Sequence, residues 1–259
     1  MKLNSGINLL ATNLQITKYI LSGVSNNFLN RKDAKKKRLK ALEITSESAK
    51  SVLKKLNVNI DYDLCREDLF KRNYFMVCNH MSYIDILVLS AIQPAVFVTS
   101  VEMEKTFFLG DMAKLGGSFF VNRVNRRKMK EEVKALENLL ADGFNVFIFP
   151  EGTSTNGEGV LPFKKSLFRV PFQTGYPILP IRLQYQSING EPFSKSNRDR
   201  ICWYDDMTFA PHFLQLMGVN GLDVSLKYME PLSPQDFESH GELSEKAFEL
   251  ISTAYKPIN

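Results

Sequence analysis

The chain has 259 residues, of which 44% are hydrophobic and 24% charged, the composition of an ordinary globular protein large enough to bury a substantial core. Residues 159–166 end in Lys-Ser but lack the glycine spacing of a phosphate-binding loop, which excludes kinases and nucleotide hydrolases of that type. The three cysteines have no Cys-x-x-Cys spacing, so no metal site is expected and a reducing compartment is indicated.

The first 60 residues carry most of the positive charge. They contain twelve Lys or Arg and three Asp or Glu, a net charge of +9, whereas the whole chain carries +5. The densest basic run, residues 31–40, follows an apolar-rich stretch over residues 7–21. This combination is typical of an interfacial helix, which buries one face in the lipid boundary and attracts anionic head groups. We expect residues 1–60 to be a basic amphipathic helical membrane-association segment; the alternative is a solvated helix pair packed on the rest of the chain.

No segment predicts a transmembrane helix or a signal peptide. The most apolar stretch, residues 84–101, contains Asp85, Gln93 and Pro94, and is more typical of a helix, a break and a strand over residues 95–99. The N-terminal apolar stretch is interrupted by polar residues, and no clear cleavage site follows it. No nucleic-acid-binding signature is visible. We therefore expect a peripheral or monotopic protein on the cytoplasmic face of the inner membrane.

A histidine and a carboxylate follow the first apolar run of the predicted sheet. Residues 75–78 are apolar, and residues 79–85, NHMSYID, contain His80 and Asp85. Open α/β sheets place ligands at such strand ends, and a histidine oriented by a carboxylate accepts a proton from a hydroxyl near neutral pH. Ser82 and Asp85 also have the spacing of a capping box that opens a helix over residues 84–92. Capping alone would explain both residues without catalysis.

Three later apolar runs repeat this strand-to-loop arrangement. Residues 116–123, GGSFFVNR, end in Arg123, and a helix-like stretch covers residues 126–140. Residues 146–154, VFIFPEGTS, stop in a Pro-Glu-Gly turn, and residues 177–181, PILPI, are bounded by prolines. The runs are continuous rather than alternating, which predicts strands buried on both faces of a sheet.

The tail after residue 189 is less regular. Alternation over residues 224–228 predicts a half-buried strand, and residues 241–255 predict a final helix. The expected fold class is α/β, with a mixed central sheet covered by helices and a basic helical N-terminal segment. Residues 61–259 are expected to form one domain.

Four blocks of the chain are similar, in order and spacing, to those of the glycerolipid acyltransferases, the family that includes bacterial 1-acyl-glycerol-3-phosphate acyltransferase. The blocks are residues 79–85, 119–123, 149–153 and 177–181, and residues 163–168, FKKSLF, also match the family pattern. One block alone would be a weak match, but four in order are specific. The resemblance implies that residues 61–259 are an acyltransferase catalytic domain.

The resemblance also implies a reaction: a fatty acyl group moves from a thioester, acyl-CoA or acyl carrier protein, to the free hydroxyl of a lysolipid. His80 would be the general base, and Asp85 would hold its ring tautomer and stabilise the imidazolium. Such a base contributes ~10²–10⁴-fold in rate. A backbone N–H near the start of the helix after His80 is the expected oxyanion donor. No cofactor, metal or covalent acyl-enzyme is needed, because the acceptor hydroxyl is the nucleophile.

The same resemblance implies an acceptor site. Arg123 would bind the phosphate or another anionic head group through its planar fork. Glu151, Gly152 and Thr153 would line the site, with glycine allowing close approach of the backbone and glutamate accepting hydrogen bonds. The competing interpretations are a generic basic surface around Arg123 and a Pro-Glu-Gly turn without a ligand.

One position departs from the phosphatidate-forming pattern. Ser154 occupies the place where an arginine usually follows Glu-Gly-Thr, and Lys164 or Lys165 would supply positive charge as a compact ammonium instead. The form EGTSTNG, residues 151–157, is also similar to lysophospholipid acyltransferases and to bacterial enzymes that acylate lyso-ornithine lipids. Lysophosphatidate is the leading acceptor, with these two lipids as alternatives.

Two functions of other classes stay open. The chain would be a non-catalytic lipid-binding protein if the fold only held a lipid, although intact His80 and Asp85 argue against this. It would be a lipid hydrolase if water replaced the acceptor hydroxyl.

Overall fold

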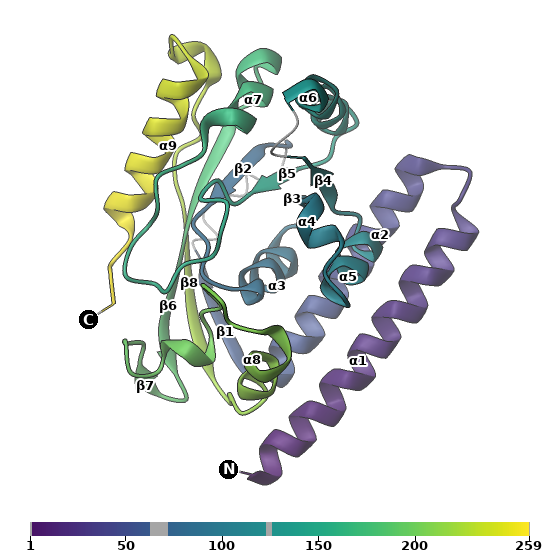
Figure 1. Cartoon of the computed structure of the whole chain (residues 1–259), viewed down its shortest axis with the longest axis vertical. Helices are drawn as coiled ribbons and strands as arrows, with labels where there is room; N and C mark the ends of the chain where they lie inside the picture. Colours follow the sequence, from purple (N-terminus) through teal and green to yellow (C-terminus); the bar gives the residue numbers. More distant parts are fainter. Residues whose placement is uncertain (1, 63–71, 123–125, 259) are drawn as a thin grey trace.

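The computed structural model describes residues 2–62, 72–122 and 126–258, which fold around one mixed sheet (Figure 1). The strand order is β1-β8-β6-β2-β5-β3-β4, with β7 paired to β6 outside this path. The strands are β1 (Val58–Tyr62), β2 (Phe75–Cys78), β3 (Val96–Ser100), β4 (Phe119–Val121), β5 (Val146–Ile148), β6 (Ile178–Ile188), β7 (Glu191–Pro192) and β8 (Leu222–Tyr228).

Strand direction places the ends of β2 and β5 together. β2 lies in the middle of the sheet and pairs in parallel with both β5 and β6, while β6 and β8 are antiparallel. Because parallel strands end at the same edge of a sheet, the loops after β2 and β5 meet there. These are the loops that begin the blocks at residues 79–85 and 149–153.

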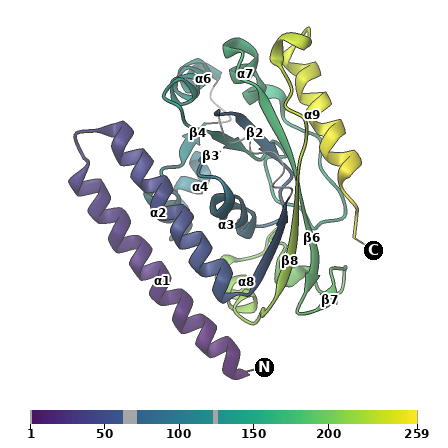
Figure 2. The ribbon, with the colours of Figure 1, turned by 180° about the vertical axis from the view of Figure 1, so that it is seen from behind.

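Helices cover both faces of the sheet, as Figures 1 and 2 show. The helices α1, α2 and α3 lie on one side, and α6, α7 and α9 lie on the other. The bounds are α1 (Lys2–Leu29), α2 (Ala34–Lys55), α3 (Tyr83–Ile92), α4 (Val101–Glu104), α5 (Leu109–Leu115), α6 (Arg126–Ala141), α7 (Arg169–Thr174), α8 (Phe209–Leu216) and α9 (His240–Ala254).

The strand residues divide between two apolar cores. Met76 and Cys78 of β2 face a core that includes α2 and α3, whereas Phe75 and Val77 face a core that includes α6 and α9. All four are fully buried, which explains why the sequence of β2 shows no polar alternation.

The N-terminal segment is a helical hairpin of two unlike helices. Asp33 caps the start of α2, and its side chain accepts from the N–H of Lys36 at 2.9 Å. α2 buries Ala49 and Leu53 in the core beside α3, while α1 lies outside α2 (Figure 2). β1 starts at Val58, so the first strand of the sheet begins before residue 60. No helix in the described part of the chain is both long and apolar enough to span a membrane.

Shortening Leu53 is expected to destabilise the whole fold, because this side chain is 3% exposed within the core. Leu53→Ala should lower the free energy of unfolding by about 2–5 kcal/mol, through lost apolar burial and the cavity left behind. The matched control is Leu14→Ala on the outer face of α1, where the side chain is 70% exposed. Urea unfolding followed by far-UV circular dichroism measures both, and equal midpoints would show that α2 is not part of the cooperative unit.

Candidate active site

His80 and Asp85 meet just after β2. Nδ1 of His80 lies 2.8 Å from Oδ2 of Asp85, and the carboxylate is fully buried while the histidine side chain is 18% exposed. Because the carboxylate is the acceptor, the proton lies on Nδ1 and Nε2 keeps a free lone pair. The structure therefore brings together the two residues that the sequence singled out, in the geometry of an oriented base.

Asp85 also caps the helix. Ser82 is the N-cap of α3, and the two residues form a complete capping box. Oδ2 of Asp85 accepts from the N–H groups of Met81 at 2.7 Å and Ser82 at 2.9 Å, and Oδ1 accepts from the hydroxyl of Tyr185. Capping and orientation of His80 are thus done by one carboxylate. These two N–H groups are engaged, so the expected oxyanion donor is neither of them.

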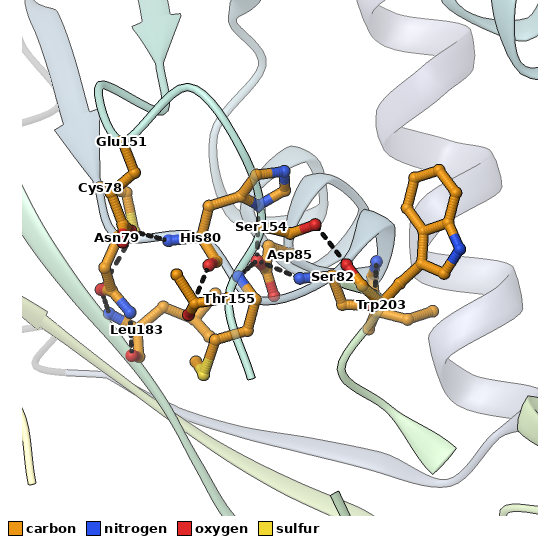
Figure 3. Close-up of polar contacts among 12 residues, drawn as sticks. Cys78, Asn79, His80, Ser82, Asp85, Glu151, Ser154, Thr155, Leu183 and Trp203 are labelled. Carbon is orange, nitrogen blue, oxygen red and sulfur yellow. Dashed lines mark hydrogen bonds and ion pairs between the residues drawn. The ribbon is translucent and has the colours of Figure 1, made fainter. Parts of the chain in front are cut away.

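The loop after β5 holds the backbone of His80 from both sides (Figure 3). The N–H of His80 donates to Oε1 of Glu151 at 2.6 Å, and its carbonyl accepts from N–H and Oγ1 of Thr155 at 2.9 and 3.1 Å. The ring of Phe149 stacks on the imidazole with centroids 3.9 Å apart and planes 13° apart. The 149–155 loop therefore fixes both the position and the ring plane of His80.

Glu151 links two segments of backbone beside His80. Its second oxygen, Oε2, accepts from the N–H of Leu161 at 2.7 Å, and the residue is only 3% exposed. Both oxygens bind backbone within the protein, so Glu151 ties the His80 loop to the chain around Leu161, and its expected place in an acceptor site stays a prediction. Burial raises the pKa of this carboxyl to about 8, even though the N–H groups of Leu161 and His80 lower it.

The glycine of the Pro-Glu-Gly turn is required by local geometry. Gly152 has φ +78°, and a Cβ placed on it would lie 2.5 Å from Nζ of Lys164. Left-handed backbone and the close approach of Lys164 explain this glycine without a substrate. The structure thus places the Lys164 ammonium directly over the turn that follows β5.

The other expected binding residues are dispersed. Lys165 forms an ion pair with Glu245 of α9, so its ammonium is directed to that helix. Thr153 is exposed, and its hydroxyl has a 3.5 Å contact to the carbonyl of Ser154. Arg123 lies outside the described residues.

Ser154 binds the chain itself. Its hydroxyl donates to the backbone carbonyl of Trp203 (Figure 3). The backbone N–H of Trp203 in turn donates to the carbonyl of Met81 at 2.9 Å. The residue that replaces the expected arginine therefore anchors the segment around Trp203 against the His80 loop.

Asn79 anchors the same loop to β6. Its side-chain amide donates to the carbonyl of Leu183 at 2.9 Å and accepts from the N–H of Leu183 at 2.8 Å. The side chain is 2% exposed, and these bonds give both its nitrogen and its oxygen a partner within the core.

An apolar cavity of about 280 Å³ opens beside His80. His80 and Phe149 line it next to the site, and further walls come from α1, α2, α3 and α8, including Ile16, Ala49 and Leu87. Its apolar walls and its position make it a candidate site for an apolar ligand beside the imidazole.

His212, which had no expected role, supports this wall. Its Nδ1 lies 2.8 Å from the hydroxyl of Tyr83, and its Nε2 lies 3.0 Å from the carbonyl of Cys202. Burial lowers the pKa of this imidazole, so it is neutral at pH 7 and bridges α8 to α3.

A family model described as Acyltransferase matches residues 55–184, about half of the chain. This range contains the His80 and Asp85 pair and the 149–155 loop that holds it. The chain belongs to the acyltransferase family. The family resemblance expected from the four blocks is therefore confirmed.

Several curated relatives of this acyltransferase-family chain are named for lysolipid acylation. The lyso-ornithine lipid O-acyltransferase of Rhizobium meliloti is 32% identical over 182 residues, which are 68% of this chain and 61% of that protein. The 1-acyl-sn-glycerol-3-phosphate acyltransferase of Neisseria gonorrhoeae is 27% identical over 176 residues, covering 68% and 67%. The match thus spans less than two thirds of the first of these relatives.

A solved structure supports the fold. The 1-acyl-sn-glycerophosphate (LPA) acyltransferase PlsC from Thermotoga maritima superposes with a TM-score of 0.68 at 24% identity, covering 98% of this chain and 95% of that one. The expected mixed sheet covered by helices is confirmed.

Glu151→Gln is expected to remove a pH dependence of stability. Between the ordinary carboxyl pKa of 4.5 and the folded value of about 8, the folded protein keeps a proton that the unfolded chain releases. This contribution to stability is complete below the unfolded pKa and is lost as the pH rises through about 8. The melting temperature of the wild type should therefore fall, relative to that of the variant, between about pH 5 and pH 9. A difference that does not change with pH would contradict the assignment.

Proposed function

We propose that the chain is an O-acyltransferase that moves a fatty acyl group from acyl-CoA or acyl carrier protein to the free hydroxyl of a lysolipid. The observation that carries the proposal is the imidazole of His80. Its Nδ1 is bound to buried Asp85, and the residue lines the apolar cavity. Acylation of a lipid hydroxyl requires a base for the hydroxyl proton and an apolar space for the hydrocarbon chain, and here the two are adjacent.

In the proposed reaction, Nε2 of His80 removes the proton from the acceptor hydroxyl as its oxygen attacks the thioester carbonyl. Asp85 stabilises the imidazolium that forms. Collapse of the tetrahedral intermediate breaks the carbon–sulfur bond, and the thiolate takes the proton from His80. The base is regenerated, and the products are an ester and a free thiol.

The acceptor head group divides the proposal into two candidates. Lysophosphatidate is the acceptor of the phosphatidate-forming enzymes that the four blocks resemble. Lyso-ornithine lipid is favoured by Ser154, because a serine in place of the usual arginine offers no cation to a phosphate. The serine hydroxyl already donates to the carbonyl of Trp203. Two relatives named for lyso-ornithine lipid acylation, at 32% and 33% identity, support the second candidate. Among the described residues, Lys164 places a cation beside the Gly152 turn, which is available to either acceptor.

We also propose that α1 and α2 bind the protein peripherally to an anionic membrane, on the cytoplasmic face of the inner membrane. Apolar side chains three to seven positions apart form an exposed stripe along α1, which we call the α1 stripe: Leu10, Leu14, Leu21, Val24 and Phe28. The basic run at residues 31–40 connects α1 to α2 at the end of this stripe. Exposed apolar area beside clustered lysines supports binding to a charged lipid surface.

Thiol release tests the reaction. Purified protein receives a long-chain acyl-CoA or acyl-ACP and vesicles that carry lysophosphatidate, a lysophospholipid or lyso-ornithine lipid. Wild type should release thiol and form the diacyl product with one of these acceptors, and His80→Ala should lose ~10²–10⁴-fold of this rate. His240→Ala, a histidine on α9 outside the site, is the matched control and should keep wild-type activity.

Three other results would point to a different mechanism or a different function. Unchanged turnover in His80→Ala would contradict the mechanism. Thiol release without any lysolipid would support a hydrolase. The absence of product with every acceptor and both donors, in a protein that binds the lipid, would favour a non-catalytic lipid-binding protein.

Removing two lysines of the basic run should weaken membrane binding. Lys32→Ala with Lys36→Ala is expected to lower the affinity for anionic phosphatidylglycerol vesicles about 30-fold, because each lysine near a charged surface contributes ~1 kcal/mol. Binding to neutral phosphatidylcholine vesicles should stay the same. The matched control, Lys134→Ala with Lys246→Ala, removes two exposed lysines from α6 and α9 on the opposite side of the sheet. Vesicle sedimentation measures the binding of both double variants to both kinds of vesicle. An equal loss of affinity for anionic vesicles in both variants would reject this surface.

A further inference from the structure

Tyr185 contacts the His80 and Asp85 pair from the part of β6 that follows the matched block at residues 177–181. It lies on β6, it is 2% exposed, and its hydroxyl donates to Oδ1 of Asp85. Within the described residues, Oδ1 has this hydroxyl as its one hydrogen-bond partner. The other three donors to the carboxylate, His80, Met81 and Ser82, all bind Oδ2.

The Asp85 carboxylate needs this donor for a physical reason. It is 0% exposed, and an ionised carboxylate without water is stable only when hydrogen bonds satisfy both of its oxygens. Hydrogen bonds to a charged group are roughly twice as strong as neutral ones. Tyr185 therefore stabilises the charged form of Asp85 and holds the plane of the carboxylate, which in turn directs Oδ2 at Nδ1 of His80.

The phenol is suited to this role because it stays protonated. Burial, and then the charge of Asp85, raise the pKa of Tyr185 well above its usual range, so its hydroxyl is protonated and acts as a donor near neutral pH. Its ring is held at a centroid distance of 5.4 Å from that of Phe193, which leaves the hydroxyl directed at the carboxylate.

We propose that Tyr185 is a positioning residue that sets the basicity of His80 through Asp85. The inference rests on the proposed function for its catalytic meaning, but the hydrogen bond itself does not. Without the hydroxyl, negative charge is less stabilised on Asp85 and binds the imidazolium more strongly. The His80 and Asp85 pair then holds its proton to higher pH, and less free base is present at neutral pH.

Other titratable groups also face the His80 and Asp85 pair. Burial raises the pKa values of Cys78 on β2, Cys202 beside Trp203, and Tyr255 after α9, so all three side chains are uncharged near neutral pH. Glu151, with a pKa of about 8, titrates on the alkaline side. It does so in the wild type and in a Tyr185 variant alike.

Tyr185→Phe removes only the hydroxyl and tests the inference. The low-pH limb of the kcat/KM profile should move up by about one pH unit, so activity at a given pH on that limb should fall about tenfold, and KM should stay unchanged. Activity should return to near the wild-type value at high pH, where the base is again free. A merely structural defect would reduce activity at all pH values and leave the limb in place.

Tyr74→Phe is the matched control, because it removes the hydroxyl of another buried tyrosine, one that contacts Arg72 rather than Asp85. It should leave the low-pH limb where it is in the wild type.

A second readout does not depend on activity. NMR titration of the His80 ring protons, assigned with His212→Ala and His240→Ala, should show a midpoint about one unit higher in Tyr185→Phe than in the wild type. An unchanged midpoint overturns the proposal, whether or not the protein turns over any substrate. A shifted midpoint in a protein that acylates no lysolipid would support the role of Tyr185 and reject the proposed function.

Discussion

The buried carboxylate of Asp85 is the interaction on which the site depends. One group caps α3, receives the N–H groups of the turn after β2, and fixes the tautomer of His80. These tasks do not conflict, because every contact is a hydrogen bond donated to the carboxylate and all of them favour its ionised form. The helix start and the oriented base are therefore one structure, and a change that disrupts the cap also releases the imidazole.

The sheet order explains how the loop that carries His80 and Asp85 is held. β2 lies between β5 and β6, so the loop that carries His80 has a neighbouring strand on each side. The β5 side supplies Glu151, Thr155 and Phe149 to the backbone and ring of His80. The β6 side supplies Leu183 to Asn79 and Tyr185 to Asp85. The loop after β2 is thereby held by contacts from both of its neighbouring parallel strands, β5 and β6.

Local spacing was enough to predict part of this arrangement. His80 and Asp85 are five residues apart in one turn, so a short motif determines their contact, and continuous apolar runs predicted the buried strands. Tyr185 was not predicted, because its contact depends on the pairing of β2 with β6, which joins residues about a hundred positions apart. For Glu151 and Lys165 the residues were identified but the directions of their side chains were not, since sequence spacing does not show which neighbour a carboxylate or an ammonium meets.

The N-terminal hairpin joins the proposed membrane surface to the proposed reaction. α1 presents the α1 stripe outward, while its Ile16 lines the cavity beside His80, and α2 contributes Ala49 to the same wall. α2 is also part of the core, so the hairpin is not a loose appendage. The α1 stripe and the cavity-lining residues lie on opposite faces of α1, because residues such as Leu14 and Ile16 differ in direction at about 3.6 residues per turn. One helix would thus contact the membrane with its outer face and close the cavity beside His80 with its inner face, so a change of α1 that altered membrane binding would also be felt at the cavity wall.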